Sequence, residues 1–350
     1  MPSIGIGFCK QKTAYEIHGD WGLANLRLTT RPDPQPGPGE VLLRMQASSL
    51  NYRDLVVLEG GYGSFTGSLP IVPLSDGAGE VVAVGDGVRR VAVGDRVCPM
   101  FFRDWIGGEP DLARLTQSLG GPLDGTMSEY MCVPESAVSR VPAAFGPEQA
   151  ACLPCAGVTA WRALAVLGAT RPGEHVLIQG SGGVALFALQ FARLFGAHIT
   201  VISSSDEKIE RLRAMGADAA INYVRTPEWA RATREITGGR GYDQIIELGG
   251  EKTLPQSLRC IRPGGTISMI GVLSGGVLQA SLGHIVTRQV RMQGITVGNR
   301  DDFEQMCRAI EQHGVAPVID RTFAFEELVP AFERLKSGRQ FGKICIRQNV

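Results

Sequence analysis

The chain has 350 residues with 35 basic and 35 acidic side chains, so its formal net charge is zero at pH 7. This length suffices for two domains with a large buried core, and no block of like charge indicates nucleic acid or a membrane surface as a partner. No stretch of about 18 residues is apolar throughout, the segment 1–10 has too few apolar residues for a signal peptide, and the eight cysteines form no disulfide pattern. We therefore expect a soluble, cytoplasmic protein.

Residues 1–140 consist of short apolar runs that prolines and glycines interrupt. We expect strands at 40–47, 79–84, 96–100 and 128–133. The segment 31–39 has a proline at every second position, so it cannot be helical and is expected to be a surface connection. This part of the chain indicates an antiparallel, partly barrel-like β domain.

From residue 147 the pattern changes to strands that alternate with helices, after a mostly helical segment at 147–167. We expect strands at 175–179, 198–202, 219–223, 242–248 and 265–271, with helices at 183–195, 206–215, 227–236 and 252–260 between them. Such alternation is typical of a parallel sheet that helices cover on both faces. A strand at 290–298 is expected to close this sheet at its edge.

The C-terminal part begins with an expected helix at 301–313, whose apolar residues recur at the spacing of one helix face. Strands expected at 318–325 and 342–347 flank a short helix and return to the first domain. We therefore predict an α/β protein with one domain of residues 1–146 and 315–350 and a second of residues 147–314. The cleft between the two domains is the expected place of the reaction.

An apolar strand runs directly into the sequence GSGGVA at 180–185 and then into an apolar helix. Gly180 allows a tight turn, Gly182 lets the backbone approach a pyrophosphate, and Ala185 lets the helix pack closely on the sheet. The helix N-terminus offers free N–H groups to phosphates, and a second strand follows at the spacing of a β-α-β unit. The turn therefore predicts a dinucleotide cofactor and hydride chemistry. The residues expected to bind it here are Gly180, Ser181, Gly182, Gly183 and Val184.

The tip of the second cofactor strand, at Ser203 and Ser204, bears on the choice between NADP and NAD. NAD enzymes place a carboxylate there for the adenosine ribose, whereas serine hydroxyls can donate to a 2′-phosphate. Asp206 is better explained as the start of the next helix, and Lys208 can supply a positive charge. NADPH is therefore the preferred cofactor. NADH is the alternative, in which Lys208 is only a solvated helix residue.

Several motifs follow one another along the chain and cover nearly its full length. They are SSLNYRD at 48–54, SDGAGEVVAVG at 75–85, VGDRV at 93–97, LPCAGVTAW at 153–161, the glycine turn, MGAD at 215–218, RPGG at 262–265 and FGK at 341–343. With these motifs the chain resembles the medium-chain dehydrogenase/reductase superfamily. The resemblance implies a GroES-like, mainly antiparallel β catalytic domain, a Rossmann domain with a doubly wound parallel sheet, and a homodimer paired through the strand at 290–298.

The metal ligands of the zinc alcohol dehydrogenases in that superfamily are not preserved here. The chain has Asn51 in place of a cysteine and Ser75 in place of a histidine, so Cys155 alone remains of the catalytic trio. A catalytic zinc needs three good protein ligands, and residues 101–123 contain no cysteine for a structural zinc lobe. We therefore expect no metal. The chain resembles the zinc-free branch, with quinone oxidoreductases and enone reductases, of which the Asn-x-x-Asp pattern of Asn51 and Asp54 is typical.

The resemblance also implies the remaining cofactor contacts. Tyr223 is expected to line the phosphate pocket with Lys208, unless it only ends a strand. Further contacts are expected from Thr159, Gly249, Gly271, Val272, Leu273, Gly298, Asn299, Phe341 and Lys343. Each of these glycines has an alternative explanation, because a glycine can merely end a strand.

The candidate catalytic residues follow from the absence of a metal. Without zinc a carbonyl oxygen loses a Lewis acid, whereas an activated double bond or a quinone needs only a donor for the charge that reaches its oxygen. The candidate donors are Asn51, Tyr52 and Tyr62, and Asp54 is expected to orient their loop. Tyr52 has the alternative of an ordinary buried tyrosine, and Tyr62, in a glycine-rich loop, that of an exposed one.

The aromatic stretch that replaces the metal lobe includes Phe102 and Trp105. We expect these two rings to form a substrate lid or, alternatively, an aromatic cluster that packs a loop.

We therefore predict an NADPH-dependent, zinc-independent oxidoreductase that transfers hydride to a quinone or to an activated carbon–carbon double bond of a small molecule. One alternative is a zinc-free alcohol or aldehyde dehydrogenase on the same scaffold. An alternative of another class is a non-enzymatic NADPH-binding sensor, against which the presence of Asn51, Tyr52 and Asp54 argues.

Overall fold

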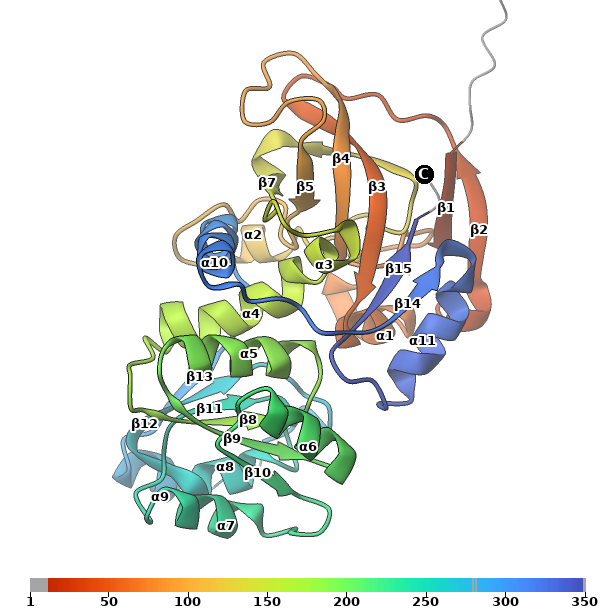
Figure 1. Ribbon diagram of the computed structural model, residues 1–350. Coiled ribbons are helices and arrows are strands. Elements are labelled where there is room, and N and C mark those ends of the chain that lie inside the picture. Colours follow the sequence, from red (N-terminus) through yellow and green to blue (C-terminus); the bar gives the residue numbers. More distant parts are fainter. Residues whose placement is uncertain (1–11, 279, 281, 349–350) are drawn as a thin grey trace, which may run out of the picture.

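Two sheet-based units make up the structure, and one lies above the other in Figure 1. The computed structural model describes residues 12–278, 280 and 282–348. The segment 1–10, on which the expectation about a signal peptide rested, lies outside these residues. Within them, no helix is long and apolar enough to cross a membrane.

The upper unit contains a seven-stranded sheet. Its strands are β3 (Glu40–Leu50), β4 (Asp76–Val84), β5 (Arg96–Pro99), β6 (Tyr130–Pro134), β7 (Val138–Arg140), β14 (Ile319–Ala324) and β15 (Lys343–Arg347). The order is β14-β15-β3-β4-β5-β7, with β6 paired to β3, and every pair except β14–β15 is antiparallel. The C-terminal strands therefore join the sheet of the N-terminal half. A separate antiparallel pair, β1 (Lys12–Ile17) and β2 (Leu26–Arg31), was not predicted from the sequence.

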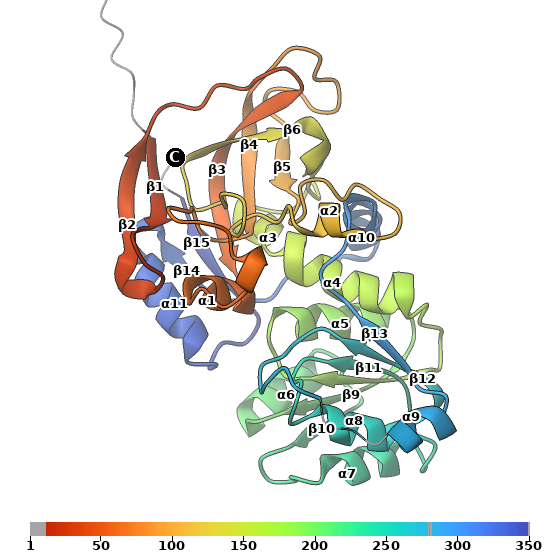
Figure 2. The ribbon, with the colours of Figure 1, turned by 180° about the vertical axis from the view of Figure 1, so that it is seen from behind.

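The lower unit is a six-stranded parallel sheet with helices on both faces (Figure 2). Its strands are β8 (His175–Gln179), β9 (His198–Ser203), β10 (Ala219–Asn222), β11 (Tyr242–Glu247), β12 (Ile261–Met269) and β13 (Arg291–Gly294), in the order β10-β9-β8-β11-β12-β13. Its helices are α5 (Gly183–Leu194), α6 (Asp206–Ala214), α7 (Trp229–Ile236), α8 (Leu254–Cys260) and α9 (Leu282–Thr287). The expected edge strand at 290–298 is thus present but shorter.

The alternation of side chains along β8 explains why helices cover both faces. Val176 and Ile178 lie in the core cluster that α5 completes, whereas Leu177 lies in the cluster of α7 and α8. The order of the strands reverses at β8, and doubly wound sheets bind ligands at such a switch point, outside the carboxyl ends of the strands. The predicted class, a doubly wound parallel sheet with a mainly antiparallel second sheet, is confirmed.

A largely helical segment connects the two units. It consists of α3 (Pro147–Ala151), wider π-helical turns at Leu153–Gly157 and Arg162–Leu167, and α4 (Val158–Trp161) between them. The remaining helices are α1 (Tyr52–Leu58), α2 (Leu112–Leu115), α10 (Arg300–His313) and α11 (Leu328–Lys336). The helical character expected for 147–167 is confirmed, and α4 lies at the level where the units meet in Figure 1.

The helix α10 leaves the lower sheet and packs against α4 and β7. The apolar face expected for it is confirmed, because Phe303 and the residues three, four and seven positions later are buried. At its first turn Asp302 accepts a hydrogen bond from Arg162 Nη1 at 2.5 Å, and these side chains are only 5% and 9% exposed. The Arg162 guanidinium also lies 4.8 Å from the Trp105 ring centroid.

The buried pair of Arg162 and Asp302 gives a stability prediction. Replacement of Asp302→Ala leaves a buried guanidinium without its carboxylate, so we expect the free energy of unfolding to fall by about 3–5 kcal/mol. Asp302→Asn keeps an oxygen acceptor and should lose only about 1–2 kcal/mol. Urea denaturation monitored by circular dichroism measures both, and equal stability of the two variants would contradict the role of the oxygen acceptor.

Candidate active site

The antiparallel pairing of β3 with β4 and β15 brings the end of β3 next to the beginnings of its two neighbours. Asn51 directly follows β3, while Asp76 begins β4 and Lys343 begins β15. Three segments that are far apart in the sequence therefore place polar side chains at one end of the upper sheet, the end that faces α5 of the lower unit in Figure 1.

Asn51 caps the N-terminus of α1. Its backbone N–H donates to Asp54 Oδ2 at 2.7 Å, which completes a capping box and fixes the loop that the sequence expected Asp54 to orient. The Asn51 side chain extends the other way, with Nδ2 3.4 Å from Ser75 Oγ. The hydroxyl of Ser75 in turn donates to Asp76 Oδ1 at 3.0 Å.

Lys343 lies at the centre of this group with a side chain that is only 3% exposed. Its Nζ donates to Leu50 O at 2.7 Å and to Asn51 Oδ1 at 2.5 Å, and it lies 3.8 Å from Asp76 Oδ2. The sequence assigned Lys343 to the cofactor pocket, whereas the structure places its ammonium group at Asn51. The link spans 292 positions, so no local pattern could have found it.

The residues at the expected metal position do not fit a catalytic zinc. Asn51 and Ser75 offer neutral groups, and burial followed by the charge of Asp76 raises the pKa of the Cys155 thiol, which favours its protonated form. The Lys343 ammonium beside them would repel a cation. Within 12–278, 280 and 282–348, no three His, Cys, Asp or Glu side chains form a group that could hold a metal ion.

The two carboxyls of the site are both buried. Burial raises the pKa of Asp54 to about 6, and the Arg53 guanidinium, 3.9 Å from Oδ1, opposes the shift. Within the part of the chain that the structure describes, this Oδ1 has no hydrogen-bond partner. Burial also raises the pKa of Asp76, against the influence of Lys343. Arg53 itself is held by Leu119 O at 2.8 Å and by Gly121 O at 2.9 Å.

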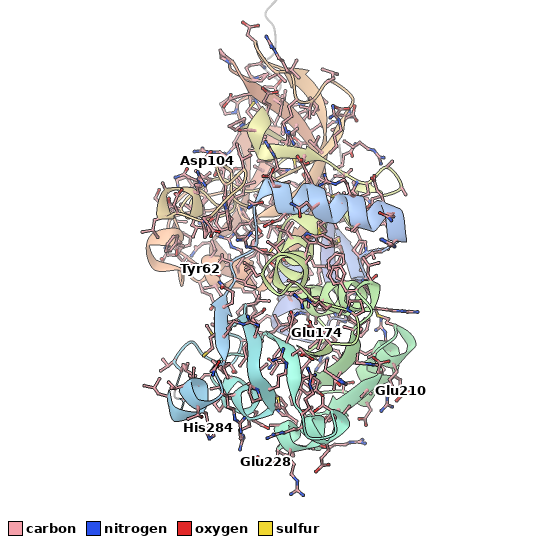
Figure 3. The ribbon with its side chains drawn as sticks, turned by 90° about the vertical axis from the view of Figure 1, so that its left-hand side faces the viewer. Tyr62, Asp104, Glu174, Glu210, Glu228 and His284 are labelled. Atoms are coloured by element: carbon pink, nitrogen blue, oxygen red, sulfur yellow. The ribbon has the colours of Figure 1, made fainter. Side chains whose placement is uncertain are left out.

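The two candidate tyrosines are accessible. Tyr52 is 46% exposed at the start of α1, so the alternative of an ordinary buried tyrosine is wrong. Tyr62 is 40% exposed, and its ring centroid lies 5.6 Å from the Arg53 guanidinium. Figure 3 shows Tyr62 at the lower edge of the upper unit, above the strands of the other sheet. Both side chains are therefore partly accessible, although burial raises the pKa of the Tyr62 hydroxyl, against the influence of Arg53.

Phe102 and Trp105 are 3% and 2% exposed, in the largest core cluster, with ring centroids 5.8 Å apart. Trp105 Nε1 donates to Gly108 O at 3.1 Å, which fixes the loop onto its own backbone. These positions favour the aromatic cluster over the substrate lid, since a lid must leave the core when the site opens.

The glycine turn fits a dinucleotide. Gly180 has a φ of 81°, and a Cβ atom added at Gly180 or Gly182 would meet no atom within 4 Å, so the turn borders open space at the N-terminus of α5. Ser181 O accepts a hydrogen bond from Gly342 N at 2.9 Å, which ties the turn to β15. A Cβ at Gly183 would lie 2.5 Å from Lys343 Cδ, so only glycine leaves room there for this side chain. Val184 is partly buried beside the core.

The predicted adenosine end is assembled from β9, β10 and α6. Ser203 is buried and Ser204 exposed, and Ser203 O accepts from the N–H of Tyr223, which is 39% exposed. Lys208 Nζ donates to Gly338 O at 3.2 Å and to Gln340 O at 3.0 Å, and burial lowers its pKa. Lys208 therefore holds a loop of the other unit, and it is not merely a solvated helix residue as the alternative had it.

Asp206 and Arg211 complete the surroundings of Lys208. Asp206 pairs with Arg225 and accepts from Asn222 Nδ2, so its carboxylate is engaged away from Lys208. Sequence reasoning missed Arg211, whose guanidinium lies 3.7 Å from the Phe341 ring centroid. Its spacing of three positions from Lys208 on one helix face was the available signal. Phe341 itself is buried.

Several other predicted cofactor residues have a packing role in the structure. A Cβ at Gly298 would lie 2.5 Å from Val158 Cγ1, and one at Gly249 or Gly271 would collide with Thr253 or with Leu248 O. Asn299 caps α10, with Oδ1 accepting from Asp302 N at 2.8 Å. Thr159 is 3% exposed, whereas Val272 and Leu273 are 58% and 54% exposed after β12. Close packing thus accounts for the three glycines without a cofactor, and cofactor contact at these positions stays a prediction.

Sequence reasoning also missed a buried polar cluster at the carboxyl ends of β8 and β11. Glu247 is 1% exposed and accepts hydrogen bonds from Gln179 Nε2 at 2.6 Å, from Ser257 Oγ at 2.5 Å and from the Thr253 hydroxyl. The backbone N–H of Gly249 donates to both Gln179 and Glu247 at 3.0 Å. The cluster fixes the loop after β11 at the switch point of the sheet. A carboxylate at the end of a buried strand was the available signal.

Two family profiles match the chain. The profile described as an alcohol dehydrogenase GroES-like domain matches residues 37–143, and the one described as a zinc-binding dehydrogenase matches residues 183–312. The first match covers most of the upper sheet, and the second covers the lower sheet except β8.

Known proteins resemble the chain over nearly its whole length. The zinc-type alcohol dehydrogenase-like protein C1773.06c of Schizosaccharomyces pombe is 43% identical over 343 residues, 95% of this chain and 98% of that protein. A solved structure from Sinorhizobium meliloti 1021, provisionally named an alcohol dehydrogenase, is 39% identical with a TM-score of 0.91, over 99% of this chain and 100% of its own. The 2-octenoyl-CoA carboxylase reductase CinF, solved with NADP and 2-octenoyl-CoA, is 25% identical with a TM-score of 0.86, over 97% of this chain and 88% of its own.

The raised pKa of Asp54 gives a pH prediction. Between pH 3.8 and about 6 the folded chain binds this proton more readily than the unfolded chain, so the free energy of unfolding falls as pH rises through this window. The full effect is about 3 kcal/mol. Asp54→Asn keeps an acceptor for Asn51 N–H and removes the titration. Urea denaturation at several pH values should show the stability of the wild type, relative to this variant, falling across the window, and a constant difference would contradict the shift.

Proposed function

The chain belongs to the medium-chain dehydrogenase/reductase superfamily and is an oxidoreductase, and we propose that it uses NADPH without zinc to reduce a quinone or an activated carbon–carbon double bond. The observation that carries this proposal is the Lys343 ammonium bonded to Asn51 Oδ1, at the position expected for a metal. A hydrogen-bond donor backed by a fixed charge suffices for an oxygen that shares its charge with a conjugated system, whereas an isolated alkoxide needs a Lewis acid.

Bound NADPH would supply a hydride to a carbon of the substrate. The phosphates fit the turn at Gly180 and Gly182, where the α5 N-terminus offers free N–H groups and open space. Asn51 Nδ2 offers a donor for the conjugated oxygen, and the hydroxyls of the partly exposed Tyr52 and Tyr62 are the candidate sources of a proton. Asp54 holds the loop of Asn51 in place through the capping box.

The comparison with CinF supports the choice of substrate class. That protein was solved with NADP and an enoyl thioester, a molecule whose double bond is conjugated to a carbonyl. The same scaffold therefore accommodates a conjugated substrate beside NADP. An alcohol or aldehyde dehydrogenase remains a second candidate, favoured by the names of the two more similar proteins. The donor set of Asn51, Ser75 and Cys155 argues against it.

We also propose that two copies associate through the edge of the lower sheet. β13 is its last strand, and exposed apolar side chains follow one another in the segment before it. They are Val272, Leu273, Val277, Leu278, Leu282 and Val286. Exposed apolar side chains close to an edge strand are candidates for an interface between copies, and light scattering that gives the mass of a monomer would count against this proposal. We propose no nucleic acid or membrane partner.

Oxidation of NADPH in the presence of a panel of quinones, enals, enoyl thioesters and alcohols tests the proposed function. We expect turnover with the quinones or conjugated substrates, and no dependence on zinc after dialysis against a chelator. Stoichiometric zinc in the purified protein, or turnover of alcohols alone that the chelator abolishes, would establish the second candidate instead.

The preference for NADPH depends on the surroundings of Lys208. Two of its three ammonium protons go to the carbonyls of the 338–340 loop, which leaves one for a phosphate oxygen. We expect Lys208→Gln to raise the Kd for NADPH roughly 10-fold and that for NADH less than about 3-fold. Fluorescence titration measures both constants, with Lys336→Gln, at a lysine that is 72% exposed on α11, as the matched control. Equal losses for the two cofactors would contradict a phosphate contact.

A further inference from the structure

The Asn51 side chain can hold a substrate oxygen only if its amide nitrogen, rather than its amide oxygen, faces the cleft. We propose that Lys343 is the positioning residue that enforces this orientation and strengthens the amide as a donor. The inference rests on the proposed function and deepens it, because it names the residue that makes Asn51 work in place of a metal.

Lys343 cannot itself touch the substrate. Its side chain is 3% exposed, and Nζ is already held by Leu50 O at 2.7 Å and by Asn51 Oδ1 at 2.5 Å. Asn51, which lies between β3 and α1 and caps α1, is less buried, so its amide is the group through which the charge would act on a substrate. Lys343 therefore acts through Asn51.

The chemistry of the neighbours leaves one orientation for the amide. A lysine ammonium has only donors, so it must face the amide oxygen and not the amide nitrogen. On the other side Nδ2 lies 3.4 Å from Ser75 Oγ, and the Ser75 hydroxyl is free to accept because its own proton goes to Asp76 Oδ1 at 3.0 Å. Asp76 Oδ2 lies 3.8 Å from Lys343 Nζ, so the four side chains form a closed ring. In this ring the lysine ammonium only donates hydrogen bonds and the Asp76 carboxylate only accepts them.

Asn51 Nδ2 carries two hydrogens, and the contact to Ser75 uses one of them. The other acceptor near the amide is Asp76, because a hydrogen bond from Asn51 is among the influences that lower the pKa of that carboxyl. A substrate oxygen would receive this second N–H in competition with Asp76. The ammonium at Oδ1 polarises the amide, which makes the remaining N–H a stronger donor in a region of low dielectric. The donor is fixed before the substrate arrives, and such preorganised donors act most strongly on the charge that develops during the reaction.

The stem of Lys343 also touches the cofactor turn. A Cβ at Gly183 would lie 2.5 Å from Cδ and 3.0 Å from Cγ of Lys343, and Gly342 N donates to Ser181 O at 2.9 Å. The Lys343 side chain thus connects two places. Its stem lies at the turn whose N–H groups are proposed to bind phosphates, and its ammonium group lies at the amide that is proposed to bind the substrate. Its place along this path explains why the ammonium reaches Asn51 with so little exposure.

A double-mutant cycle with Lys343→Met, Asn51→Ala and the double variant tests this role in the purified full-length protein. At saturating NADPH, with the best conjugated substrate of the panel, we expect Lys343→Met to lower kcat roughly 10- to 100-fold. The double variant should be no slower than Asn51→Ala alone, since the lysine has nothing to position without the amide. Lys343→Gln should resemble Lys343→Met, because a neutral amide also offers an oxygen to Asn51 and no longer dictates its orientation. Lys336→Met is the matched control.

Two further measurements separate positioning from other roles. The Kd for NADPH should change less than about 3-fold in Lys343→Met, and Lys343→Arg, which keeps the charge and the donors, should recover most of the lost kcat. A large rise in Kd with an unchanged kcat, or losses that multiply in the double variant, would overturn the inference in favour of a cofactor contact.

A readout without turnover keeps the inference apart from the proposed function. In ¹⁵N-labelled protein the side-chain amide signal of Asn51, identified by its absence in Asn51→Asp, should shift in Lys343→Gln. An unmoved signal overturns the positioning role even where turnover is normal. A wild type that is inactive on the whole panel but shows the shift overturns the proposed substrate class and upholds the orientation of the amide.

Discussion

A buried ammonium group must have oxygen partners, and those of Lys343 join three strands of the upper sheet at the end nearest the cofactor turn. Isolated charges are too costly to bury, so the chain has to bring oxygens to Nζ from the end of β3 and from the beginning of β4. The stem that reaches them passes over Gly183, at the first turn of α5, where a larger residue would collide with it. The position of the cofactor turn and that of the upper sheet are thereby coupled through one side chain.

The parts of the site that the sequence could predict are those whose partners lie within a few residues. The capping box joins Asn51 and Asp54 across three positions, and the turn at Gly180 requires only its own φ of 81° and the helix that follows. The bond from Lys343 to Asn51 spans 292 positions and exists only because β15 pairs with β3. Strand pairing of this kind is a property of the whole fold, so the motif around Lys343 predicted a cofactor contact but could not predict the bond of its ammonium group to Asn51.

Burial of large or polar side chains was the other feature that local patterns could not supply. Trp105 has the same sequence neighbours whether it covers a substrate or fills the core, and only the packing of α10 and Arg162 against it distinguishes the two. The same holds for Tyr52, which lies at the start of a helix whose later residues are buried and is nevertheless exposed. Lys208 shows the opposite case, since a helix position that looks solvated holds a loop of the other unit.

A charge that acts through an amide selects substrates differently from a metal ion. A zinc ion binds an oxygen directly and stabilises a full alkoxide, whereas the Lys343 charge stays behind Asn51 and offers the cleft one polarised N–H. Such a donor favours acceptors whose negative charge is already spread over a conjugated system, because these need little more than alignment and exclusion of water. Asn51 and Ser75, which stand where zinc alcohol dehydrogenases have a cysteine and a histidine, therefore bear on the choice of substrate as well as on metal binding. The carboxylate of Asp76 is fully buried and accepts hydrogen bonds from Ser75 and from the Cys155 N–H. The side chains at this place thus form a chain of hydrogen bonds, and under the proposed function such a chain suits a substrate oxygen that shares its charge with a conjugated system.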